Sequence, residues 1–268
     1  MISNMNMLIC RITSALVLFG ACIACAPNGP NMRELERAEA AAGERTRKEL
    51  VAYMPLETMF PDAKLRALAR AAGRGDTTRV DALLQKGVDI NGRGSSGAVA
   101  LYWAMHDIRG FRHLLERGAD PNVVFDDGGS VLHWAVIHEN PAFYEALLAH
   151  GADPNLRAGV LEQTPLFQVL RDDRNQRINR LLEAGADIDA RDATGWTPLM
   201  VAATDREYEL VYEFLQLGVD YRVTTNSGMD LADIVAFDRG RGLVSDENTK
   251  MWLNKVIAWL EAHGVAVE

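Results

Sequence analysis

The feature that most constrains this chain is a repeat with a period near 33 residues. Apolar anchor positions recur at Leu68, Leu101, Leu132, Leu166, Leu199 and Ala232, at intervals of 33, 31, 34, 33 and 33 residues. A period of this length is typical of solenoids, in which each unit packs only against its neighbours. The chain is therefore predicted to form a stack of about six similar units.

Each unit contains the signals of two short helices. The anchor opens the first helix, and an apolar pair marks the second helix, at Leu83–Leu84, Leu114–Leu115, Leu147–Leu148, Leu181–Leu182 and Phe214–Leu215. A glycine and an acid follow each pair, and Asn91, Asn122 and Asn155 come next in three units. Glycine can adopt the left-handed conformation that ends a helix, while Asp and Asn suit the turn into the next unit. Stacked neighbours are predicted to bury the apolar face that one such helix pair leaves open.

Two segments and one recurring run resemble the ankyrin repeat. The segments are Gly195–Met200 and Val131–Ala135, and the run is Gly-Ala-Asp-Pro-Asn. The resemblance covers Lys64 to Glu268 and implies an all-α ankyrin-repeat solenoid of about six helix-turn-helix units over residues 63–268. It also implies an N-terminal helix and a C-terminal capping helix over residues 249–262. The second unit is short, which predicts trimmed helices, and the last unit holds an insertion at residues 239–247.

The first 25 residues are predicted to be an export signal. Arg11 is followed by the apolar run 12–19 and then by small residues, which is the order of a signal peptide. The run is shorter than the roughly 20 residues that a membrane-spanning helix needs. Residues 18–22 resemble the lipobox of bacterial lipoproteins, which implies acylation of Cys22, with Cys25 as the second choice. Cleavage near Ala24 or Ala26 without a lipid, or an uncleaved anchor, are the alternatives.

The lipobox resemblance also implies a location. Ile23 follows Cys22, where an Asp would retain a lipoprotein of Gram-negative bacteria in the inner membrane. The mature chain is therefore expected on the periplasmic side of the outer membrane, or soluble in the periplasm. Residues 26–31 are predicted to be a tether, because turn residues dominate them. Residues 32–62 are predicted to hold a helix and a linker, and periodicity leaves open whether that helix packs on the solenoid.

The sequence offers no constellation for catalysis, a cofactor or a metal. All three cysteines lie in the first 25 residues, so the rest of the chain has no thiolate site. His133 and His138 are five residues apart, which is the wrong spacing for a zinc pair on one helix, and His133 is expected to cap or pack. No phosphate loop, nucleophile elbow or dinucleotide fingerprint occurs. The chain is expected to be a binding protein and not an enzyme.

The charge narrows the class of partner. The formal net charge of −9 argues against nucleic acid, because a phosphate-binding surface needs a local excess of Lys and Arg. A protein with a basic or mixed-charge surface is expected instead. Contact with a membrane is expected only through the N-terminal lipid.

The ankyrin resemblance implies that the partner binds the concave face, built from the loop tips before each anchor and the exposed end of each first helix. The tip positions are Ser95, Ser96, Phe125, Asp126, Asp127, Val160, Leu161, Gln163, Ala193, Thr194, Trp196, Thr225 and Asn226. Trp196 and Phe125 are candidate contacts because aromatic residues are enriched at binding hot spots. The alternative for Trp196 is that it folds back over Pro198. Asp126 and Asp127 join them as candidate contacts.

A column of acids is the second surface signal. The sixth residues after the anchors are Arg74, Asp107, His138, Asp172, Asp205 and Asp238. An Asp near a helix C-terminus opposes the helix dipole, so local stability does not explain its repetition. Asp172, Asp205 and Asp238 are therefore candidate partner-binding residues that would attract a basic patch. A solvated position that any polar residue can fill is the alternative.

These observations indicate a protein-interaction module tethered in the bacterial envelope. Similar ankyrin lipoproteins suggest an immunity protein that neutralises a toxin delivered into the periplasm, such as a lipase-type effector. The alternative is a structural or chaperone-like partner that protects a periplasmic enzyme such as a catalase. Neither the partner nor the oligomeric state follows from the residues.

Overall fold

The computed structural model describes residues 54–126, 128–170 and 175–267, all of which belong to one compact unit. The predicted N-terminal helix, the tether and the lipobox cysteines lie outside these residues. The described elements are α3 (Leu56–Met59), α4 (Ala63–Ala72), α5 (Thr77–Gln85), η2 (Ser95–Gly97), α6 (Ala100–Trp103), η3 (Ala104–His106), α7 (Ile108–Glu116), α8 (Val131–Ile137), α9 (Ala142–Ala149), η4 (Pro165–Val169), α10 (Asn175–Glu183), α11 (Pro198–Thr204), α12 (Tyr208–Gln216), α13 (Leu231–Arg241) and α14 (Glu247–Ala262).

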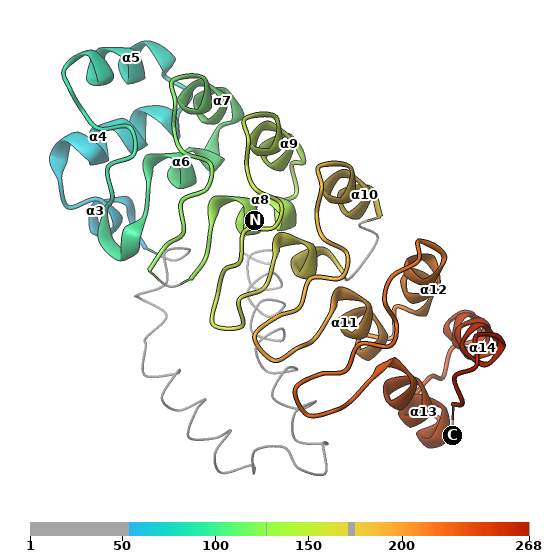
Figure 1. The fold of residues 1–268 in the computed structure, drawn as a ribbon. Coiled ribbons are helices and arrows are strands. Elements are labelled where there is room, and N and C mark those ends of the chain that lie inside the picture. Colours follow the sequence, from blue (N-terminus) through green and yellow to red (C-terminus); the bar gives the residue numbers. More distant parts are fainter. Residues whose placement is uncertain (1–53, 127, 171–174, 268) are drawn as a thin grey trace. The chain divides into compact units, whose positions relative to one another are not determined.

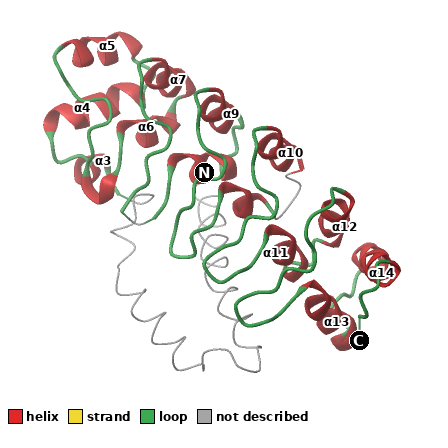
Figure 2. Cartoon of the chain, viewed as in Figure 1, coloured by secondary structure: helices red, strands yellow, loops and turns green. Residues whose placement is uncertain are grey.

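The helices form two rows, which confirms the predicted all-α solenoid (Figure 1). The inner row contains α4, α6, α8, η4, α11 and α13, and the outer row contains α5, α7, α9, α10, α12 and α14. Each helix packs mainly on its own partner and on adjacent units. Loops join each outer helix to the next inner helix and turn at one edge of the stack (Figure 2).

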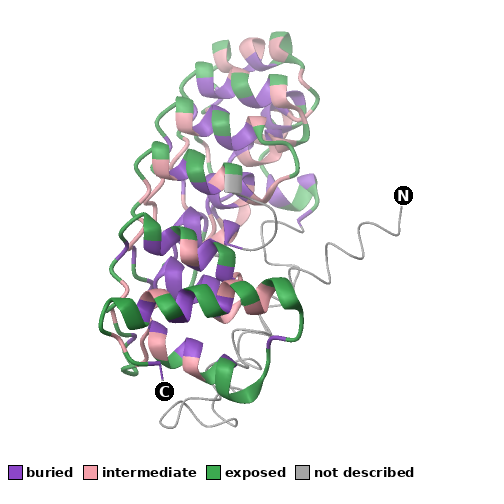
Figure 3. Ribbon diagram, turned by 90° about the vertical axis from the view of Figure 1, so that its right-hand side faces the viewer, coloured by how far each residue is buried: buried purple, intermediate pink, exposed green. Residues whose placement is uncertain are grey.

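The core lies between and within the two rows (Figure 3). The predicted anchors are buried, with the exception of Ala232, which is half-buried because Leu231 takes the interior position in that unit. The second-helix residues Leu83, Leu114, Leu147, Leu181 and Phe214 are buried as well. The closing helix α14 buries Val256 and Leu260 and packs against α12, so the predicted C-terminal helix is confirmed.

The predicted turn residues also link adjacent units. The side chain of Asn155 accepts from the amide of Asp187 at 2.7 Å and donates to the carbonyl of Gly185 at 2.9 Å. Asn122 and Asn91 make the same pair of bonds one and two units earlier. The turn role predicted for these asparagines is confirmed. The hydrogen bonds that these side chains make to the next unit were not predicted, because their partners lie about one repeat away along the chain.

Three local expectations need correction. In the second unit only the first helix is shortened, to α6 and the 3-10 turn η3, whereas α7 keeps nine residues. In the last unit, α13 continues through the first part of the predicted insertion and ends at Arg241, and Gly242 caps it with a φ of 59°. The helix α14 begins at Glu247, because Asp246 caps it by accepting from the amide of Thr249.

The described part of the chain contains no strand, only two isolated bridges. Within the same residues, no helix combines the length and the apolar character that crossing a bilayer requires.

Candidate protein-binding surface

Five loop tips form a continuous edge of the solenoid. We call residues 95–97, 126 and 128, 159–162, 193–195 and 226–228 the tip row. Backbone bonds join each tip to the next: the amide of Asp126 donates to Ser96, that of Gly159 to Gly128, that of Ala193 to Leu161, and that of Asn226 to Thr194. Because every tip is bonded to a neighbour, the row is a preorganised surface, and a partner that binds it pays little ordering entropy.

Arginine side chains brace the loops behind the tips. Arg93 donates to the carbonyl of Val124 at 2.8 Å, one unit further on, and pairs with Asp126. Arg191 makes the corresponding bond to the carbonyl of Thr224 at 2.7 Å. Arg157 instead pairs with Glu162 of its own loop at 3.3 Å. The bonds of Arg93 and Arg191 cross between units, so the spacing of those tips is set by the stack and not by each loop alone.

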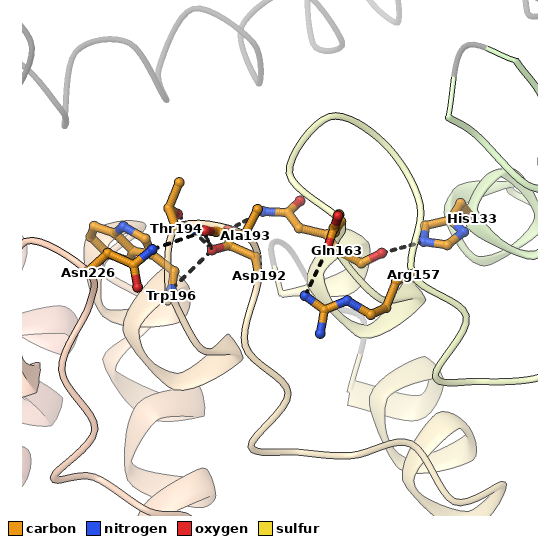
Figure 4. Close-up of polar contacts among 9 residues, drawn as sticks. His133, Arg157, Gln163, Asp192, Ala193, Thr194, Trp196 and Asn226 are labelled. Atoms are coloured by element: carbon orange, nitrogen blue, oxygen red, sulfur yellow. Dashed lines mark hydrogen bonds and ion pairs between the residues drawn. The ribbon is translucent and has the colours of Figure 1, made fainter.

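A buried polar network lies beneath the second to fourth tips (Figure 4). One oxygen of Asp192 accepts from the amide and hydroxyl of Thr194 and from the amide of Trp196, and its other oxygen accepts from the side chain of Gln163 at 3.1 Å. His133 lies next along the network and donates from Nε2 to the carbonyl of Gln163 at 2.9 Å. The network therefore ties three consecutive units together under the tips.

His133 fills the structural role predicted for it. Its Nδ1 lies 2.7 Å from the hydroxyl of Ser130, and its Nε2 carries a hydrogen because the carbonyl of Gln163 can only accept. Burial lowers the pKa of His133, so the ring is neutral at neutral pH. Among the residues that the structure describes, no three His, Cys, Asp or Glu side chains gather where they could hold a metal ion.

The predicted contact residues at the tips differ in how far they are exposed. Trp196 is half-buried against the core, and its amide is held by Asp192. Phe125 is only 2% exposed, so the prediction that it is a surface contact is wrong. The ring turns inward because it packs edge-on against Tyr102, with ring centroids 5.2 Å apart. Asp126 is exposed and paired with Arg93, and Asp127 lies outside the described residues.

The predicted acids do not form one column on the surface, because those that the structure describes lie in different surroundings. Asp238 is 4% exposed and accepts from the hydroxyl of Tyr208 at 2.9 Å and from Arg206. Asp107 caps the start of α7 by accepting from the amides of Arg109 and Gly110. Asp205 is half-buried at the C-terminal cap of α11, and Asp172 lies outside the described residues. The same offset from the anchor falls in different local structures, because the first helices differ in length.

Asp238 is instead a structural residue. It pairs with Arg206, whose φ of 64° is unusual for a side chain other than glycine. The first unit has Gly75 at the corresponding position, with a φ of 67°. Burial first, and then the charge of Asp238, raises the pKa of Tyr208, which therefore stays protonated and donates to the carboxylate.

The third tip, residues 159–162, differs from the others in length. Four tips are closed by a bond between residues four apart, as in Phe125 to Gly129 and Asp192 to Trp196, whereas Ala158 bonds with Gln163, five residues on. The extra residue accounts for the interval of 34 between Leu132 and Leu166. It leaves Val160 90% exposed at the end of the loop. The sequence places Val160 among the tips, but only that interval could have singled it out.

Comparisons with known proteins agree with this architecture. A family model described as "Ankyrin repeats (3 copies)" matches residues 68–158 and 132–225. The chain is 37% identical over 139 residues to Protein PhlB of Serratia liquefaciens, covering 51% of this chain and 61% of that protein. It is 32% identical over 165 residues to human Ankyrin repeat and SOCS box protein 6, covering 56% of this chain and 39% of that protein. The chain thus spans less than two thirds of either relative.

Two solved structures share the fold. The ankyrin repeat domain of Bcl-3 matches with a TM-score of 0.61 and 25% identity, over 75% of this chain and 86% of that one. A chain in the complex of the Bd0816 predatory endopeptidase from Bdellovibrio bacteriovorus with immunity protein Bd3460 matches with a TM-score of 0.58 and 22% identity. The second match covers 70% of this chain and 97% of that one.

Proposed function

The chain belongs to the ankyrin-repeat family of protein-interaction modules, and from that premise we propose that it binds one envelope protein through its tip row. The observation that carries the proposal is the chain of backbone bonds that joins all five tips. A preorganised edge binds without first having to be ordered, which is the property of a dedicated recognition surface. No catalytic step is part of this function.

We propose further that the partner is a toxin, of the lipase-effector class, and that the chain neutralises it in the periplasm. Two observations support this role, and the second favours it over the protective alternative. The predicted export signal, with its lipobox-like end at Cys22, would hold the chain where such a toxin arrives. The same fold occurs in a complex whose title names an endopeptidase and an immunity protein.

The test of this role is affinity capture of the mature chain from envelope extract, followed by expression of the captured protein in a host with an export signal. Immunity requires that the captured protein arrests growth and that co-expression of the chain restores it. A captured enzyme that is harmless to the host, and that loses activity faster without the chain, would support the protective role. Failure to capture any envelope protein would contradict both.

Binding through the tip row predicts a kinetic effect of Trp196→Ala. Its ring is half-exposed beside the fourth tip, where a partner can cover it. Loss of this apolar contact is expected to raise the dissociation rate about tenfold, with little dependence on salt. The measurement is surface plasmon resonance with the captured partner. The matched control is Leu217→Ala, because Leu217 is 62% exposed at the end of the outer helix α12, and it should leave both rates unchanged.

The proposed lipid anchor predicts different effects of replacing Cys22 and Cys25. Cys22→Ser is expected to abolish incorporation of labelled palmitate and to leave an unprocessed or soluble product, because acylation needs the thiol. Cys25→Ser should be labelled like the wild type. Normal labelling of the Cys22 variant would transfer the site to Cys25 or exclude lipidation.

A further inference from the structure

The third tip combines features that the other tips lack. Its one-residue extension carries Val160, which is the most exposed large apolar residue of the described chain, with half-buried Leu161 beside it. A single exposed valine is ordinary on a protein surface. Val160 differs from such a residue because it lies at the end of a lengthened loop in a row of candidate binding tips. Its side chain is 90% exposed and therefore does not stabilise the loop by packing.

Two backbone bonds to neighbouring tips hold this loop in place. The amide of Gly159 donates to Gly128 of the preceding tip, and the carbonyl of Leu161 accepts from Ala193 of the following tip. The approach to Gly128 is so close that a Cβ on that residue would lie 2.7 Å from the Cα of Gly159. Glu162 adopts a φ of 51° to close the turn. The protrusion therefore keeps its shape without a partner, and its exposure does not come from disorder of the loop.

The surrounding tips are polar or small. Their end residues are Ser95 and Ser96, Asp126, Ala193 and Thr194, and Asn226 and Ser227. Protein interfaces commonly place a few apolar anchors inside a polar rim that excludes water. The tip row has this arrangement, with Val160 as its apolar point and the other tips as the rim.

The charge at the base of the loop restricts the partner's site. Arg157 and Glu162 pair with each other at 3.3 Å, so the two charges beside the protrusion cancel. Val160 therefore has no free charge beside it that could pair with a charged group of the partner. Burying such a group against Val160 would cost its desolvation free energy, and no ion pair would offset that cost. A convex apolar tip buries its area only in a concavity, because a flat surface would touch its end alone.

We propose that Val160, with Leu161 beside it, is the anchor of the interface and seats in an apolar, uncharged pocket of the partner protein. The inference rests on the proposed function, since it needs a protein partner at the tip row. Beyond the proposed function, the inference specifies the chemistry of the partner's pocket and the residues of this chain that fill it. Trp196, next to the following tip, is then a secondary contact of the same interface.

The experiment is photocrosslinking of the full chain in its own envelope. The probe, p-benzoylphenylalanine, replaces Val160 in one variant, Asn226 at another tip in a second, and Leu217 outside the row in a third. The expected result is one discrete adduct from position 160, whose cross-linked peptide lines an apolar cavity of the partner, and none from position 217. A weaker adduct to the same partner is expected from position 226.

The other outcomes separate the two proposals. An adduct from position 226 but not from 160 would overturn the anchor and leave the proposed function standing. Adducts from neither tip would overturn both. An adduct of two copies of this chain, or flotation of wild type but not of Val160→Asp with vesicles of phosphatidylethanolamine and phosphatidylglycerol, would replace the partner pocket with self-association or a lipid surface.

Point variants give a quantitative check on the cross-linked partner. Val160→Asp is expected to weaken its binding at least about tenfold, because a desolvated carboxylate would enter an apolar pocket. Val160→Ile keeps the shape and is expected to bind within about twofold of the wild type. Equal binding by Val160→Asp and wild type would overturn the anchor. Circular dichroism and melting of both variants should match the wild type, since the side chain is outside the core.

Discussion

Replacing Leu181 with alanine is expected to lower the free energy of unfolding by about 2–5 kcal/mol, the usual range for a buried leucine. Leu181 lies in the outer helix α10 with no exposed surface, in the middle of the stack. The loss combines the transfer free energy of the removed carbons with the cavity that remains, because neighbouring units can relax only in part. The loss should be large because the core in a solenoid is shared between units, so one cavity weakens two interfaces.

The measurement is urea denaturation of the full chain followed by circular dichroism at 222 nm, a wavelength at which helix dominates. Leu217→Ala serves as the control, since that side chain is 62% exposed and surface changes usually stay within about 0.5 kcal/mol. A loss below about 1 kcal/mol for Leu181→Ala would contradict the buried position. A change in the slope of the transition would show instead that the units no longer unfold together.

Replacing Gly110 with alanine is expected to destabilise the protein by about 1–3 kcal/mol or more, the range for an overpacked contact. Gly110 lies in the first turn of α7, where the helix crosses the end of α4. A Cβ there would overlap the carbonyl oxygen of Ala72 and lie 2.7 Å from its carbonyl carbon. Backbone atoms cannot rotate away as a side chain does, so α7 would have to move from α4.

Gly240 provides the matched control, because it is also a glycine within a helix. It is exposed near the end of α13, and a Cβ there would meet nothing within 4 Å. Gly240→Ala is expected to stabilise the protein by up to about 0.5–1 kcal/mol, the usual gain when alanine replaces a glycine inside a helix. The two variants should therefore shift the melting temperature in opposite directions. A stabilised Gly110→Ala would contradict the close packing of α7 on α4.

The repeat made the architecture predictable to an unusual depth. Each anchor, apolar pair and turn asparagine could be assigned from spacing, since the same local signals recur in every unit. Lengths were predicted less well: α13 runs on to Arg241, and in the fourth unit the first helix is the 3-10 turn η4. Where one unit departs from the repeat, no second copy indicates how its helix ends.

The candidate surface was predictable only as a row of loop positions. Phe125 and Asp238 were assigned to it by offset from an anchor, yet both are buried by partners from other units or other elements, Tyr102 and Tyr208. Val160, in contrast, is exposed in the structure because its loop is one residue longer than the neighbouring loops. An offset identifies an equivalent place in each unit, but the length of the loop or helix decides which way the side chain points.

The sequence by itself determined what depends on local chemistry: the helix pairs, the glycine turns and the stacking of similar units. The tertiary structure alone decided which of two helical glycines packs against another backbone, which acids are buried and which tip protrudes. Gly110 and Gly240 have the same helix propensity, but only Gly110 faces another backbone at close range. The difference arises because packing depends on contacts between residues far apart in the chain, which no local pattern records.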